Sequence, residues 1–165
     1  MSETVDIFQV LKDLDIPYEK QEHKAIFSEE DSKDVVITLK GTDVKNLFVK
    51  DKNKNYGLVS MDLHKRADLK KIAEQFGFGR LSFCNPDELM KYLNITPGSV
   101  TPLCIMFDTE KKVKVLFDEN FEGKKVIIHP LRNTASISLT FDDLKRFTEH
   151  FGHTWQLGDV YKEED

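Results

Sequence analysis

Lys45 and Asn46 interrupt the apolar stretch Val44–Val49 and place a cation and an amide on what the pattern predicts to be a strand. A lysine in that position can extend its ammonium group to solvent along its aliphatic chain, or it can place the charge in a cleft. A cation in a cleft would suit a phosphate-bearing ligand. Lys50 follows on the same predicted strand and adds a second positive charge.

The loop Thr96–Pro102 combines restricted and permissive backbone. Pro97 and Pro102 limit the chain to few conformations, whereas Gly98 allows the backbone to approach a ligand closely. Ser99 follows the glycine and adds a hydroxyl group. A turn with a purely structural role has the same composition, so the residues alone leave both interpretations open.

His129 ends the apolar run Lys125–His129 directly before Pro130 and a polar loop. A histidine at the end of an apolar strand is commonly a core residue whose ring nitrogens are hydrogen bonded. Its position before a proline and a polar loop also makes it a candidate for the mouth of a pocket, because histidine titrates near neutral pH.

Other common chemistries have little support. Cys84 and Cys104 stand apart, each beside apolar residues, and are expected to be small buried hydrophobic side chains. His150 and His153 flank a predicted helix end at Gly152, and we expect a solvent-exposed pair and no zinc site. Dinucleotide-binding, P-loop, nucleophile-elbow and H-E-x-x-H motifs are absent from the sequence. No metal or cofactor is therefore expected.

Composition bounds the remaining choices. The chain has 165 residues, of which 39% are hydrophobic, and this suits one compact domain. It has no apolar run of the ~20 residues that a membrane span needs and no signal-peptide pattern, so we expect a soluble cytoplasmic protein. The net charge of -5 disfavours a nonspecific nucleic-acid coat protein. The segment 45–71 nevertheless contains eight basic and three acidic residues, and it is either a solvated face or a phosphate-binding surface.

The periodicity of apolar residues predicts the elements that must position these groups. Helices are expected near residues 5–14, 28–39, 69–76, 86–93 and 141–151. Two β-hairpins are expected, one from 44–50 and 56–61 and one from 99–107 and 112–117, with further strands at 18–27, 125–129 and 135–141. Without regular βαβ units, the sequence predicts an α+β fold: a single domain over residues 1–165 with a mixed, mostly antiparallel sheet flanked by helices, and a frayed tail at 159–165.

Five segments in this order resemble a known family: Lys45–Phe48 with Lys50-Asp51 after it, Arg80–Phe83, Thr96–Pro102, His129-Pro130 and Asn133–Ala135. Together they resemble the YbaK/prolyl-tRNA synthetase insertion-domain family of aminoacyl-tRNA editing deacylases, most closely its freestanding ProX or PrdX branch. The resemblance extends from the first helix to about Gly158. It implies hydrolysis, in trans, of the ester of a wrongly charged tRNA, with alanine on proline tRNA as the substrate of this branch.

The resemblance also assigns roles to residues. The catalytic group would be Lys45, Gly98 and His129, and the substrate-binding group would be Asn46, Lys50, Ser99 and Pro102. The family's essential lysine falls on Lys45 and would hold the tRNA 3′ end or the ester. The family's G-x-x-x-P loop falls on Gly98 and Pro102, whose backbone would meet the aminoacyl carbonyl, and His129 would shape the pocket.

An aminoacyl ester is already activated, so its hydrolysis needs positioning and charge stabilisation more than a strong nucleophile. The family is expected to use the terminal ribose 2′-hydroxyl or a bound water, and to exclude the bulkier proline by size. The partners implied are the acceptor end of aminoacylated tRNA(Pro), with segment 45–71 against the acceptor stem, and prolyl-tRNA synthetase. Two alternatives remain open: a deacylase for cysteine or serine, and a non-catalytic module that binds tRNA or a synthetase.

Overall fold

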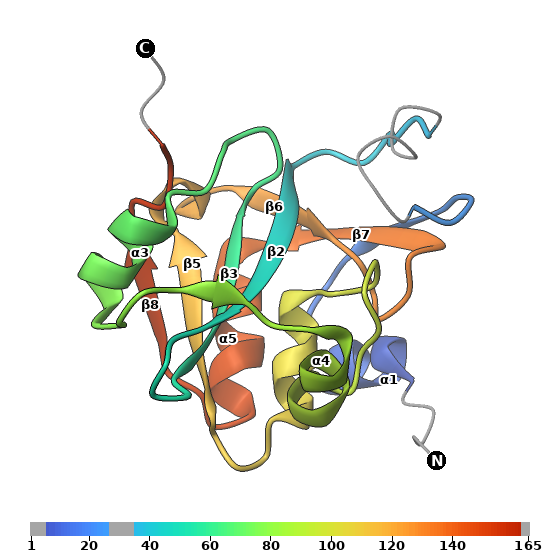
Figure 1. The fold of residues 1–165 in the computed structure, drawn as a ribbon. Helices are drawn as coiled ribbons and strands as arrows, with labels where there is room; N and C mark the ends of the chain where they lie inside the picture. The colour runs from blue at the N-terminus through green and yellow to red at the C-terminus, as the bar shows by residue number, and fades with distance from the viewer. Residues whose placement is uncertain (1–5, 27–34, 163–165) are drawn as a thin grey trace.

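The computed structural model describes residues 6–26 and 35–162 (Figure 1). Its centre is an eight-stranded mixed sheet with the order β1-β7-β6-β2-β3-β5-β8, and β4 pairs with β2 beside this path. The strands are β1 (Glu19–Glu22), β2 (Thr42–Lys50), β3 (Tyr56–Asp62), β4 (Ser82–Phe83), β5 (Val113–Asp118), β6 (Lys125–Ile128), β7 (Ala135–Thr140) and β8 (Trp155–Gly158). The helices are α1 (Ile7–Asp13), α3 (Leu69–Phe76), α4 (Pro86–Leu93) and α5 (Phe141–His150), with short 3₁₀ helices η1 (Pro102–Phe107) and η2 (Glu119–Phe121).

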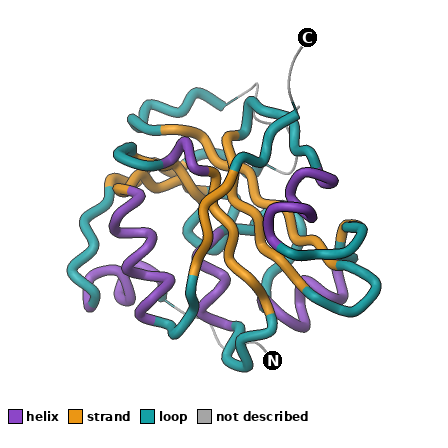
Figure 2. The backbone as a smooth tube through the Cα atoms, turned by 90° about the vertical axis from the view of Figure 1, so that its left-hand side faces the viewer, coloured by secondary structure: helices purple, strands orange, loops and turns teal. Residues whose placement is uncertain are grey.

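Strand alternation divides the core into two layers, because successive side chains of a strand point to opposite faces of the sheet. Phe48 and Leu58 face the larger layer, where they pack with residues of α1, α4, α5 and η1. Their neighbours Val49 and Val59 face the smaller layer, formed with α3 and with Val160 near the chain end. Helices therefore cover both faces of the sheet (Figures 1 and 2). The α+β fold predicted from the sequence is confirmed.

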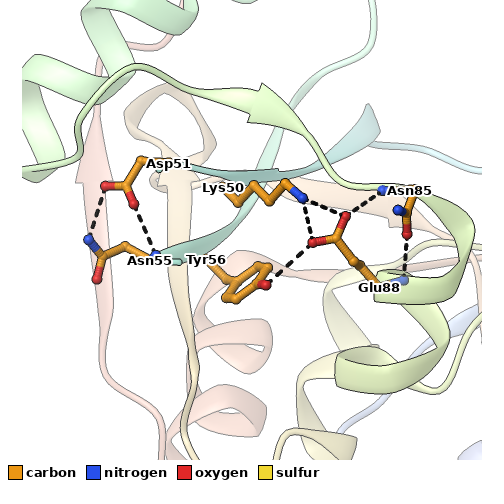
Figure 3. A network of polar contacts seen from close by, with 6 residues as sticks. All are labelled: Lys50, Asp51, Asn55, Tyr56, Asn85 and Glu88. Atoms are coloured by element: carbon orange, nitrogen blue, oxygen red, sulfur yellow. Dashed lines mark hydrogen bonds and ion pairs between the residues drawn. The ribbon is translucent and has the colours of Figure 1, made fainter. Parts of the chain in front are cut away.

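The predicted hairpin of β2 and β3 is present, with Lys45 opposite Met61 and Asn46 opposite Ser60. Its turn is organised by the buried carboxylate of Asp51, which accepts hydrogen bonds from the backbone N–H and the side chain of Asn55 (Figure 3). The same carboxylate accepts from the backbone N–H groups of Asn53 and Gly79. These bonds lower the pKa of Asp51 to about 2, the Asn55 side chain first among them.

The second predicted hairpin is wrong. Residues 102–107 form η1, because Pro102 suits the first helical position and the Thr101 hydroxyl accepts a hydrogen bond from the N–H of Leu103. Strand β5 pairs instead in parallel with β3 and with β8. Since α3 lies between β3 and β5 along the chain, the structure also contains a helical crossover that the sequence analysis did not expect.

The other predicted elements have mixed outcomes. Helix α4 begins with the expected Asn85 cap, completed by Glu88 in a reciprocal capping box, and Thr140 caps α5. The helix predicted for 28–39 is wrong for its described part, 35–39, which has no regular structure; the remainder lies outside the described residues.

The predicted frayed tail is wrong for residues 159–162. Val160 is buried and its oxygen accepts a hydrogen bond from the N–H of Asp68, while the N–H of Lys162 donates to the oxygen of Arg66. The last three residues, 163–165, lie outside the described part. No helix in the described part of the chain has the length and apolar character to cross a bilayer.

Candidate functional site

A cleft of about 490 Å³ opens beside the first half of β2. Four residues singled out from the sequence line it together: Lys45, Asn46, Gly98 and His129. They come from β2, from the loop before η1 and from the end of β6, so the fold brings together segments that lie far apart in the chain. Aliphatic side chains, among them Ile26, Ile37 and Ile127, line much of the rest of it.

Asn46 connects three segments around this cleft. Its side-chain Nδ2 donates a hydrogen bond to the main-chain oxygen of Val100 at 3.1 Å, and its Oδ1 accepts one from the hydroxyl of Ser60 at 2.6 Å. Ser60 lies opposite Asn46 on the neighbouring strand β3. The amide therefore joins the loop that contains Gly98 to the hairpin that contains Lys45.

The loop itself is built around a left-handed residue. Gly98 has φ +91°, a conformation that residues with a Cβ rarely adopt, and the N–H of Ser99 donates to the oxygen of Thr96 to close the turn. Ser99 and Pro102 are buried and do not line the cleft, whereas Gly98 and Val100 do. Of the three loop residues chosen from the sequence, Gly98 alone reaches the cleft; Ser99 and Pro102 contribute to the shape of the loop.

His129 is held in one tautomer. Its Nδ1 lies 3.2 Å from the main-chain oxygen of Ala135, and a carbonyl oxygen can only accept, so Nδ1 carries the proton. Burial lowers the pKa of His129, and the nearby His23 imidazole, with ring centroids 6.5 Å apart, has a smaller effect in the same direction. At neutral pH the ring is uncharged, and its Nε2 is a hydrogen-bond acceptor.

Asp43, His64 and Ser136 also line the cleft, and none of the three was predicted from the sequence. The carboxylate Oδ2 of Asp43 lies 3.5 Å from Nε2 of His64. The hairpin register contained a signal for this pair: with Val44 opposite Asp62, residues at the start of β2 and just after β3 must lie close together. Asp43 also precedes Lys45 by two positions, which places both side chains on the same side of β2.

Lys50 lies elsewhere. It is the last residue of β2, five positions from Lys45, and at that end of the strand it lines a second cavity of about 710 Å³. Its ammonium group contacts both carboxylate oxygens of Glu88, at 2.9 and 2.8 Å, and the Tyr56 hydroxyl donates to the same carboxylate at 3.3 Å (Figure 3). The hydrogen bond to Glu88 raises the pKa of Lys50. The structure thus separates Lys50 from the cleft that contains Lys45.

Comparison with known proteins places this architecture in a family. Residues 23–147 match the family model described as the aminoacyl-tRNA editing domain. The chain belongs to this family. Its members' activity makes it an aminoacyl-tRNA deacylase, and the cleft beside β2 lies within the matched region.

Curated relatives agree with that assignment, and a solved structure has the same fold. The chain is 34% identical over 148 residues to the prolyl-tRNA editing protein ProX of Acetoanaerobium sticklandii, covering 88% of this chain and 90% of that one. It is 35% identical over 151 residues to prolyl-tRNA synthetase associated domain-containing protein 1 of Bos taurus, covering 88% of each. A solved structure described as a candidate trans-editing enzyme for prolyl tRNA synthetase has the same fold, with a TM-score of 0.71, 19% identity and coverage of 98% of this chain and 100% of that one.

The two cysteines and the His150–His153 pair lie outside the cleft of this deacylase. Burial raises the pKa of the Cys84 and Cys104 thiols to about 12, which disfavours the thiolate that a nucleophile needs. The prediction of an exposed histidine pair is wrong for His153, which is buried with its Nε2 3.0 Å from Oδ2 of Asp108. Across residues 6–26 and 35–162, no three His, Cys, Asp or Glu side chains are grouped as metal ligands would be.

Proposed function

We propose that this deacylase removes alanine from mischarged Ala-tRNA(Pro) in trans, in the cytoplasm, and spares Pro-tRNA(Pro). The observation that supports the proposal most directly is the convergence of Lys45, Gly98 and a neutral His129 on one cleft. The names of the similar proteins, a prolyl-tRNA editing protein and a prolyl-tRNA synthetase associated protein, support the choice of proline tRNA.

The proposed roles follow from the charge and geometry of each group. The Lys45 ammonium group binds the terminal phosphate or the ester end of the tRNA, where it offsets negative charge. The backbone beside Gly98 contacts the aminoacyl carbonyl, since the loop is held against β2 by Asn46. Nε2 of His129 accepts a hydrogen bond from the attacking group, either the ribose 2′-hydroxyl or a water, and orients it toward the ester.

Size supports alanine as the residue removed. The aliphatic part of the lining can pack against a methyl group, which needs no polar contact. A hydrophobic pocket gains only ~1–3 kcal/mol of binding free energy per methylene, so favourable packing alone separates alanine from proline weakly. Discrimination between the two esters therefore rests on a clash of the larger proline ring with the cleft wall.

The second cavity is the proposed contact for the acceptor stem. It is lined by the cations of Lys50, Lys52, Lys54, Arg80 and Lys91. Its two acids are engaged, since Asp51 binds the hairpin turn and Glu88 pairs with Lys50. The five steps along the strand from Lys45 to Lys50 span about 17 Å, so one tRNA can place its 3′ end in the cleft and its phosphates near the second cavity. Prolyl-tRNA synthetase is the further proposed partner.

The experiment that tests the specificity compares alanyl, seryl, cysteinyl and prolyl esters of the same tRNA(Pro) at equal concentration. The proposal predicts that alanine is released at least tenfold faster than the other three amino acids. Faster release of cysteine or serine would assign the deacylase to another small amino acid. Binding of tRNA without cleavage of any of the esters would favour the non-catalytic module.

A further inference from the structure

Asp43 gives the cleft a feature that the proposed roles leave unused. Among the described residues that line the cleft, it is the one acid, beside the cation of Lys45 and the imidazoles of His64 and His129. The Asp43 carboxylate is not buried in the core: its side chain is 36% exposed, and the side chain of its partner His64 is 73% exposed. The carboxylate is therefore accessible to a ligand in the cleft.

The carboxylate is nevertheless held in place. The main-chain oxygen of Asp43 accepts a hydrogen bond from the N–H of Leu63 at 2.9 Å, which continues the β2–β3 pairing by one residue. The N–H of His64 donates to Oδ1 of Asp62 at 2.9 Å, and this bond fixes the turn from which the His64 ring reaches Asp43. Hydrogen bonds therefore fix both the backbone of Asp43 and the turn that carries His64, and the carboxylate has a defined place in the cleft.

The spacing of charges in the cleft matches the end of an aminoacyl-tRNA. Lys45 is two positions from Asp43 on the same side of the strand, about 7 Å away along β2. An aminoacyl ester carries a positive α-ammonium group on the carbon next to the ester carbonyl, and negative phosphates on the nucleotide side. A carboxylate and a cation from neighbouring positions of one cleft can bind these two ends with opposite charges and fix the direction in which the ester lies.

We infer that Asp43 binds the α-ammonium group of the aminoacyl ester and thereby selects α-amino esters over uncharged acyl esters. The inference rests on the proposed function, because it takes the aminoacyl end of tRNA as the ligand of the cleft. Asp43 would then determine specificity for the charge of the substrate, and the aliphatic side chains of the cleft would determine specificity for its size.

Binding of two amide-linked analogues tests this directly. The probes are acceptor minihelices of tRNA(Pro) ending in 3′-amino-3′-deoxyadenosine, one carrying an alanyl amide and the other a lactyl amide, in which a hydroxyl replaces the ammonium group. The amide resists hydrolysis, so the dissociation constants are measured at equilibrium. We expect the wild type to bind the alanyl probe about tenfold more tightly, and Asp43→Asn to bind both within about twofold.

Asp87→Asn is the matched control, since Asp87 is an exposed acid in the first turn of α4 and does not line the cleft. It should keep the wild-type preference, and thermal melting of both variants reports folding. Equal binding of the two probes by the wild type, or an unchanged preference in Asp43→Asn, would overturn the inference. Failure of the proposed function appears separately, as absence of alanine release from ester-linked Ala-tRNA(Pro) by the wild type.

Discussion

The side-chain amide of Asn46 on β2 donates to the main-chain oxygen of Val100, 54 positions further along the chain, at 3.1 Å. Because Gly98 lies two residues before Val100, this bond sets how far the loop stands from Lys45. The same side chain accepts from Ser60 at 2.6 Å, so its orientation is fixed from the other direction. Asn46 is thus a positioning residue between the two halves of the cleft.

Asn46→Asp tests that role. A carboxylate cannot donate to the Val100 oxygen, and we expect kcat/KM to fall at least tenfold and the free energy of unfolding to fall by about 1–3 kcal/mol. Ser60→Ala is the control, because it removes the second hydrogen bond and leaves the bond to Val100 in place; its loss of activity should be smaller. Full activity of Asn46→Asp in a single-turnover assay would contradict the positioning role.

Gly98→Ala and Gly77→Ala form a matched pair. Both glycines have positive φ, +91° and +77°, and alanine in this region costs ~1–2 kcal/mol. Gly77 ends α3, away from the cleft, and a Cβ there would meet no atom within 4 Å. Chemical denaturation should therefore show similar losses of stability in both variants, while only Gly98→Ala loses deacylation. Equal deacylation activities of the two variants would show that the loop around Gly98 has no role in the reaction.

The lowered pKa of His129 predicts the pH dependence of the reaction. A free histidine titrates near 6.5, and burial keeps His129 neutral below that pH, so kcat/KM should stay level as the pH falls through 6.5 and decline only further down. The lowered pKa also affects stability: as the pH falls below 6.5 the unfolded chain binds more protons than the folded one, so the free energy of unfolding decreases until the folded pKa is reached.

His129→Asn provides the corresponding variant. Its Nδ2 can replace the Nδ1 donor to Ala135, but nothing replaces the Nε2 acceptor. We expect a folded protein with little activity, and a difference in stability from the wild type that narrows below pH 6.5. An inflection at 6.5 in the wild-type rate profile would show that His129 titrates like a free histidine.

The double variant Cys84→Ala, Cys104→Ala should keep turnover within about twofold of the wild type. With both pKa values raised to about 12, neither thiol supplies a thiolate at neutral pH. Some stability should be lost, because Cys104 is completely buried and its removal leaves a small cavity. Loss of turnover in a variant that melts as one folded species would mean that a cysteine takes part in the reaction.

Local patterns predicted the elements that are determined locally. The Asn85 cap followed by Pro86 predicted α4, and the polar turn around Asp51 predicted the β2–β3 hairpin. The strand predicted for residues 102–107 was wrong, because an apolar run is compatible with a strand as well as with a buried helix. Pro102 at the first helical position and the Thr101 cap favour the helix. Parallel pairing of β5 with β3 and β8 depends on contacts distant in sequence, which no local period encodes.

Some residues of the candidate site could be predicted from the sequence and others could not. The family resemblance singled out Lys45, Asn46, Gly98 and His129, and the fold brings them together. Lys50 was grouped with them because it is close in sequence, although each residue of a strand adds about 3.4 Å and Lys50 therefore lies at the far end of β2, beside the second cavity. Asp43 became a candidate only when the strand register placed it beside His64 in the cleft.

The most direct test of the account follows the release of labelled alanine from Ala-tRNA(Pro) by the wild type and by Lys45→Ala, with Pro-tRNA(Pro) as the second substrate. Lys12→Ala, an exposed lysine in the last turn of α1, controls for the loss of one positive charge. The account predicts rapid release of alanine and not of proline, abolished in Lys45→Ala and retained in Lys12→Ala. Undiminished release by a folded Lys45→Ala variant, or no release by the wild type, would contradict it.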